Sequence, residues 1–104
     1  MARTPIHPGE ILADELADSG MTASELARIL GVPPNRITQI LAGKRAVTAD
    51  TALRLGQWLG VSPELWLNLQ KLYEIDLAWQ TLTEELKAIP RRQVPAPELD
   101  TALK

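Results

Sequence analysis

The segment 22–41, TASELARILGVPPNRITQIL, constrains the fold of this chain more than any other stretch, because it contains the signals for two short helices around a tight turn. Thr22 followed by Glu25 has the spacing of a capping box, which marks the start of a helix. Gly31 comes after the apolar residues of that helix, where a chain can leave it with a positive φ. Within a helix, the proline pair at 33–34 is tolerated only in the first turn, so we expect a second helix to begin there.

The second helix, which we expect to run to Ala42, has one apolar and one polar face. Its apolar side chains recur at helical spacing, as a buried face requires: Ile37, Ile40 and Leu41. Its other face is polar and is expected to be exposed: Asn35, Arg36, Thr38 and Gln39. Asn and Gln pair with adenine, Arg pairs with guanine, and Thr bonds to bases or touches the thymine methyl group. Solvation alone is the other interpretation, but the preceding helix and turn favour base reading in DNA.

Basic residues gather around this segment. Between Thr22 and Leu59, five basic residues stand against two acidic ones, a local net charge of +3 in a chain whose net charge is −2. Lys44 and Arg45 directly follow the second helix, where they can contact DNA phosphates or, alternatively, cap the helix dipole. The local excess favours phosphate contacts, and the acidic balance of the whole chain argues against indiscriminate coating of nucleic acid.

Helix signals continue on both sides of this segment. The run HPGE at 7–10 starts a helix that Gly20 ends, and Thr48 starts another that Gly60 ends. Ser62 begins a fifth helix in the same way. No stretch alternates between apolar and polar residues over a useful length, so no strand is expected and the predicted fold class is all-α.

The fifth helix carries a second apolar pattern. Apolar side chains recur every seven residues in two series. The first series is Leu65, Leu72, Trp79 and Leu86, and the second is Ile75, Leu82 and Ile89. This heptad-like stripe packs either on the chain's own helices or on a second copy, and the excess of apolar surface favours a second copy. The candidate dimer interface is Leu65, Trp66, Leu69, Leu72, Ile75 and Trp79. Thr81 and Glu84 have capping-box spacing as well, so a separate short helix past Trp79 remains an alternative.

Length and composition limit the remaining possibilities. A chain of 104 residues without cysteine is expected to form one domain with neither disulfides nor thiolate metal sites. No signal core and no apolar run of membrane length are present, so we expect a cytoplasmic protein. Three prolines between Pro90 and Pro97 mark a tail. The expected division is a DNA-binding and dimerisation domain over 1–79, then a helical extension and Pro-rich tail over 80–104.

Enzyme chemistry is not expected. The single histidine, His7, lies at a helix start, where a capping or packing role fits better than catalysis or metal binding. Ser24 and Ser62 belong to helix starts, and no second histidine exists to activate either of them. Asp14 and Glu15 are adjacent on a helix and diverge, so they do not form a catalytic pair. The sequence therefore predicts no catalytic residue, no metal and no cofactor.

The chain resembles the HigA/VapI-type antitoxins of the Cro/CI-like helix-turn-helix family over roughly residues 5–79. The matching parts are IHPGEIL at 6–12, the helix-turn-helix at 22–41, AGKRAVTADTALRLGQWLG at 42–60 and SPELWLNLQKLYEIDLAW at 62–79. HPGE together with TADTALRL and SPELWLNLQ makes the resemblance specific. It implies a five-helix, lambda-repressor-like domain that dimerises through its C-terminal part and represses its own operon. It also implies a toxin partner of the HigB type, an mRNA-cleaving ribonuclease that the antitoxin blocks.

Carried over position by position, the family pattern implies base contacts at Asn35, Arg36, Thr38 and Gln39, and backbone contacts at Lys44 and Arg45. Two positions depart from it. Ala23 stands where many relatives have a phosphate-contacting Gln, and Pro34 occupies a further base-facing position. We expect the homodimer to bind an inverted-repeat operator in double-stranded DNA. A stand-alone repressor without a toxin is one alternative, and a toxin-neutralising interaction module with little DNA affinity is another.

The first helix is acidic, with four carboxylates between Glu10 and Asp18 and only Arg3 as a basic residue before Met21. A toxin that holds RNA is expected to be basic, and opposite charges favour docking. We therefore expect part of the toxin contact at Asp14, Glu15 and Asp18. An acidic face that serves only solubility is the alternative.

Overall fold

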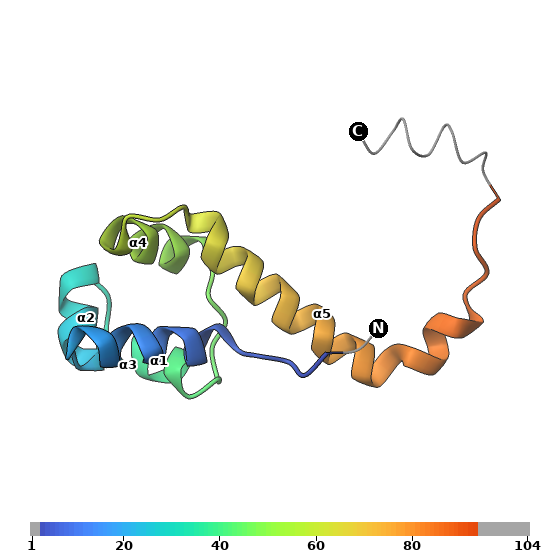
Figure 1. Ribbon diagram of the computed structural model, residues 1–104, viewed down its shortest axis with the longest axis horizontal. Helices are drawn as coiled ribbons and strands as arrows, with labels where there is room; N and C mark the ends of the chain where they lie inside the picture. Colours follow the sequence, from blue (N-terminus) through green and yellow to red (C-terminus); the bar gives the residue numbers. More distant parts are fainter. Residues whose placement is uncertain (1–2, 94–104) are drawn as a thin grey trace.

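The computed structural model describes residues 3–93, and these form five helices and no strand. The helices are α1 (Pro8–Ser19), α2 (Ala23–Leu30), α3 (Pro34–Leu41), α4 (Ala49–Leu59) and α5 (Pro63–Ala88). Figure 1 shows α1 to α4 gathered at one end of the molecule and α5 extending away from them. The predicted all-α, five-helix fold is confirmed. The Pro-rich tail from residue 94 onward lies outside the described residues.

One hydrophobic core lies between the four short helices and the first turn of α5. α4 packs on α5, α2 packs on α3, and α1 contacts both α3 and α5. Helices α1 to α4 contribute aliphatic side chains, and burying one fully stabilises the fold by about 1.5–3 kcal/mol. The core consists of Leu12, Leu16, Leu26, Ala27, Leu30, Val32, Ile37, Ile40, Val47, Ala52, Leu55 and Trp66.

The N-terminal end of α1 lies tightly against the C-terminal end of α3. A Cβ atom at Gly9 would overlap the carbonyl oxygen of Ile40, so only glycine allows this approach. His7 is the N-cap of α1: its Nδ1 accepts a hydrogen bond from the backbone N–H of Gly9 at 2.8 Å, and the side chain is buried. The predicted capping role of His7 is confirmed. The close approach of Gly9 to Ile40 fixes the position of α3 relative to α1.

The helix boundaries follow the sequence signals with two differences. Thr48 is the N-cap residue of α4, but its side chain makes no capping hydrogen bond. α5 runs without a break through Thr81, so the alternative of a separate short helix is wrong. The hydroxyls of Thr81 and Thr83 donate to the carbonyls of Ala78 and Trp79 instead. Such bonds bend helices, and Figure 1 shows α5 changing direction in its last third.

The segment before α1 ties α5 to the rest of the molecule. Figure 1 shows it running from α1 to α5, where the Arg3 guanidinium lies 3.1 Å from the buried carboxylate of Asp76. The rings of His7 and Tyr73 meet edge to face, with their centroids 4.8 Å apart. The first half of α5 is thus held on two sides, by α4 and by this segment.

Over residues 3–93, no helix is long and apolar enough to cross a membrane.

Candidate nucleic-acid interface

The turn between α2 and α3 is built as the sequence predicts. Thr22 and Glu25 form a reciprocal capping box at the start of α2, with bonds of 3.1 and 2.8 Å. Gly31 ends α2 with φ +73°, in the left-handed region. The N–H of Val32 then donates to the carbonyl of Ala27 at 3.0 Å, and the Val32 side chain is buried in the corner. These contacts fix the angle at which α3 leaves α2.

α3 buries one face and presents the other to solvent. Ile37 and Ile40 are fully buried in the core. On the opposite face, Asn35 and Thr38 are exposed, whereas Arg36 and Gln39 are half-buried. The structure thus brings the four candidate base-reading residues onto one helix face, but only two of them are as exposed as the sequence suggested.

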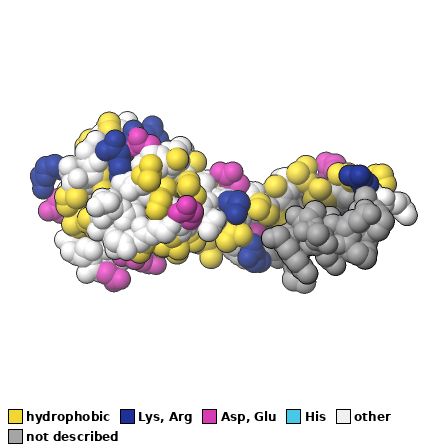
Figure 2. Space-filling view, turned by 90° about the horizontal axis from the view of Figure 1, so that it is seen from above, with side chains coloured by type: hydrophobic (Ala, Val, Ile, Leu, Met, Phe, Trp, Pro, Cys, Tyr) yellow, Lys and Arg dark blue, Asp and Glu magenta, His cyan; other side chains and the backbone are white. Residues whose placement is uncertain are grey.

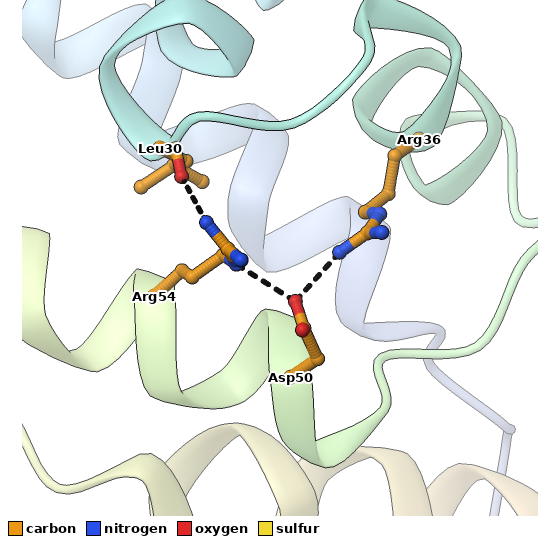
Figure 3. A network of polar contacts seen from close by, with 4 residues as sticks. All are labelled: Leu30, Arg36, Asp50 and Arg54. Atoms are coloured by element: carbon orange, nitrogen blue, oxygen red, sulfur yellow. Dashed lines mark hydrogen bonds and ion pairs between the residues drawn. The ribbon is translucent and has the colours of Figure 1, made fainter.

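Arg36 is half-buried because it has a partner on α4 (Figure 3). Its Nη1 lies 2.6 Å from Oδ1 of Asp50, and Nε of Arg54 donates to the same oxygen at 2.8 Å. Arg54 also donates through Nη1 to the carbonyl of Leu30, the last residue of α2, at 2.7 Å. The hydrogen bonds from Arg54 and then Arg36 hold the pKa of the Asp50 carboxyl below its usual range.

Asp50 and Arg54, which connect α4 to α3 and α2, were not predicted from the sequence. Their separation of four residues on α4 is a readable signal, because side chains four apart on a helix are neighbours. The pairing of Arg36 with Asp50 joins residues on different helices that are 14 positions apart. No periodicity in the sequence indicates that contact.

Lys44 and Arg45 lie exposed in the loop that follows α3. The carbonyls at the end of α3 receive backbone N–H groups, including that of Lys44, which donates to Gln39 at 2.9 Å. Among the residues that the structure describes, neither cation forms an ion pair. Arg45 and Arg36 line a hollow of about 270 Å³ at the N-terminal end of α4, together with Thr48 and Asp50. Arg45 therefore lies near Arg36 of the polar face, and Lys44 precedes it in the same loop.

α5 presents most of the candidate dimer residues at the surface. Leu65, Leu72 and Ile75 are 47%, 39% and 43% exposed, and Leu69 and Trp79 are half-buried. Figure 2 shows hydrophobic side chains at the surface of both the globular part and the narrower part that α5 forms. Trp66 does not belong with them, because it is 1% exposed and packs inside the chain's own core. Its assignment to the dimer interface was wrong.

The acidic residues of α1 are at the surface as expected, with Asp14 and Asp18 exposed and Glu15 half-buried. The last turn of α1 contains no basic residue. Within residues 3–93, no group of three or more His, Cys, Asp or Glu side chains comes together in a way that could hold a metal ion.

Comparison with known proteins agrees with this geometry. The profile of the helix-turn-helix family matches residues 12–66. The chain is 47% identical over 76 residues to virulence-associated protein I of Dichelobacter nodosus, covering 72% of this chain and 70% of that protein. An antidote protein of the HigA family from Coxiella burnetii has a similar structure, with a TM-score of 0.84 and 48% identity over 86% of this chain and 100% of that one. Antitoxin HigA of Pseudomonas aeruginosa, solved with the higBA promoter, gives a TM-score of 0.81 and 34% identity over 88% of this chain and 100% of that one.

The chain belongs to the Cro/CI-like helix-turn-helix family, among its HigA/VapI-type antitoxins. The predicted family is confirmed. Members of this family are regulators and antitoxins and not enzymes, which agrees with the prediction that the chain is not an enzyme.

Proposed function

We propose that this protein is a DNA-binding antitoxin that represses its own toxin–antitoxin operon as a homodimer. The observation that carries the proposal is α3, which presents its polar face at the surface and is followed by two exposed cations, while its apolar face is fixed in the core. The likeness to an antitoxin HigA solved with the higBA promoter supports DNA binding by this chain. A helix of this kind fits the major groove, where base pairs are distinguishable.

The expected operator is an inverted repeat. Each chain supplies one recognition helix, and a two-fold partner through α5 would place the second one on the next major groove. The half-sites should then lie about one helical turn apart, roughly 34 Å. The promoter of the chain's own operon is the expected site.

Substitutions on α3 and in the following loop should have different effects on DNA binding. Arg36→Ala or Gln39→Ala should cost about 1–3 kcal/mol on the operator and relax base preference, because these side chains reach base edges. Lys44→Ala or Arg45→Ala should weaken binding to all sequences alike and flatten the salt dependence, because phosphates carry no sequence information. Mobility shifts on the promoter and on scrambled DNA distinguish the two classes. Equal, weak binding of wild type to both DNAs would reject the repressor function.

The second part of the proposed function is neutralisation of a HigB-type, mRNA-cleaving toxin. The acidic surface of α1 supports a contact there, because Asp14 and Asp18 are exposed and the last turn of α1 has no cation to offset them. A toxin that binds RNA is expected to present positive charge.

Reversing Asp14, Glu15 and Asp18 to Lys should abolish protection from toxin-induced growth arrest while operator binding survives. Growth at equal expression and mobility shifts on the promoter measure the two activities separately. A triple variant that still protects cells would rule out α1 as the docking surface. If the wild type binds the operator but does not protect cells, the stand-alone repressor is supported. If it protects cells but does not bind the operator, the interaction module is supported.

A further inference from the structure

The Asp50 carboxylate joins three elements of the DNA-binding unit through a single oxygen atom. Oδ1 of Asp50 accepts hydrogen bonds from Arg36 on α3 and from Arg54 on α4. Arg54 then bonds to the carbonyl of Leu30 at the end of α2. Figure 3 shows the two guanidinium groups converging on this oxygen from opposite sides.

This arrangement fixes the Arg36 guanidinium without using all of its donors. A guanidinium has five N–H donors, and only Nη1 of Arg36 bonds to Asp50. The Arg36 side chain keeps 27% of its surface exposed and lines the hollow at the N-terminal end of α4, so part of it stays accessible. A free arginine on the surface would lose rotamer freedom on binding a base, and Asp50 removes much of that cost before DNA arrives.

Asp50 also changes the charge that DNA meets. Its side chain is 55% exposed, beside two arginines and the hollow that Arg45 lines. The hydrogen bonds from the two arginines lower its pKa, so the carboxyl stays ionised at neutral pH. Phosphates attract bare guanidinium groups whatever the base sequence. A carboxylate at this place repels phosphates. Arg36 then keeps its remaining donors for directional hydrogen bonds to a base edge.

We propose that Asp50 is a positioning residue that sets the sequence specificity of this protein by holding Arg36 for base reading and by weakening phosphate binding at the same place. The inference rests on the proposed function, since it concerns how the same helix discriminates between DNA sequences. It assigns to an acidic residue of α4 a part in recognition by α3. Specificity here needs an element that disfavours wrong DNA as well as one that favours the operator.

The test is Asp50→Asn, which keeps the shape of the side chain and removes its charge. Affinity for scrambled DNA should rise and affinity for the operator should fall, so that the ratio of the two dissociation constants shrinks about tenfold. The salt slope of binding to scrambled DNA should steepen by about one, because one more cation meets a phosphate. An unchanged ratio and slope would overturn the proposal. Thermal unfolding establishes that the variant is folded.

Two further variants show whether Asp50 acts through Arg36. In an Arg36→Ala background, Asp50→Asn should change the specificity ratio much less than in the wild type, and the same loss in both backgrounds would overturn the proposal. Arg36→Lys keeps the charge but not the planar guanidinium group. This substitution alone should therefore lower the specificity ratio. This result does not depend on whether Asp50→Asn folds.

Arg54→Gln is the matched control, since it removes the bonds of Arg54 to Leu30 and to Asp50 and keeps the pair of Arg36 with Asp50. It should lower thermal stability and leave the specificity ratio near that of the wild type. If Arg54→Gln lowers the specificity ratio as much as Asp50→Asn does, Asp50 only joins helices, and the proposal is overturned. If wild type itself binds operator and scrambled DNA equally, the proposed function fails and the inference fails with it.

Discussion

At the scale of single residues, the start of α2 depends on one ionised carboxylate. Oε1 of Glu25 accepts the backbone N–H of Thr22, and Oγ1 of Thr22 accepts the N–H of Glu25. The hydrogen bond from the Thr22 backbone, and after it the hydrogen bond from the Thr22 side chain, lower the pKa of the Glu25 carboxyl below its ordinary value of 4.5. The folded state therefore favours the ionised form more than the unfolded chain does, so this cap couples helix stability to pH.

Glu25→Gln should show this coupling. Because the pKa of Glu25 is lower in the folded protein, its contribution to the free energy of unfolding is present above pH 4.5 and is lost as pH falls through the folded value. Gln can accept the same backbone bond but does not titrate. The melting temperature of the variant should lie below that of wild type at pH 7, and the difference should shrink at pH 3. A difference that is the same at both pH values would contradict this role.

The hydrogen bonds that sequence reasoning found are those between close neighbours in the chain. The capping box of Thr22 and the cap at His7 join residues two or three positions apart, and helix geometry dictates such pairs. Arg36 lies on the polar face of α3 as expected, but its bond to Asp50 depends on how helix packing places α4 relative to α3. That packing follows from the whole core, so residue spacing alone could not reveal the partner of the candidate base reader.

At the scale of helices, a buried glutamine on α5 holds the loop that carries the two exposed cations. Oε1 of Gln70 accepts the backbone N–H of Val47 at 2.9 Å, and its Nε2 donates to Glu74 at 2.7 Å. Both Gln70 and Val47 are buried. The loop with Lys44 and Arg45 is thus attached to the helix proposed to form the dimer.

Gln70→Leu should destabilise the protein by about 1–3 kcal/mol, because the N–H of Val47 would stay buried without an acceptor. Gln80→Leu is the matched control: it lies exposed on the same helix and should change stability by no more than about 0.5 kcal/mol. Urea denaturation of both variants measures the difference. Equal stabilities would mean that the loop finds another acceptor or is not held by Gln70.

The helix boundaries were largely predictable, but the environment of α5 was not. Ser62 does cap its start, whereas Thr81 lies inside the helix and not at a new start. Trp66 directly follows Leu65, a member of the heptad-like stripe, yet it is buried in the chain's own core. Heptad spacing shows which side chains share a face. It does not tell whether a neighbouring helix of the same chain or a second chain covers that face.

At the scale of the whole molecule, α5 is longer than the core that it helps to cover. Beyond its first turn, it buries only Gln70 and Asp76, which are both polar. Six of its large aliphatic side chains are exposed: Leu65, Leu72, Ile75, Leu77, Leu82 and Leu86. Figure 1 shows this helix extending past the other four. Soluble proteins rarely leave such a continuous apolar surface uncovered, which supports a second copy packing along α5.

Ile75→Glu should separate the proposed dimer, because it would bury an unpaired charge in the interface. Operator affinity should collapse, since each chain would bring only one recognition helix to an inverted repeat, while helicity by circular dichroism should largely survive. Gln80→Glu is the matched control, as it places the same side chain at an exposed position on another face of α5. Light scattering measures the mass of both variants. A dimer that persists in Ile75→Glu would place the interface elsewhere, and the exposed residues between Trp58 and Trp66 would be the next candidates.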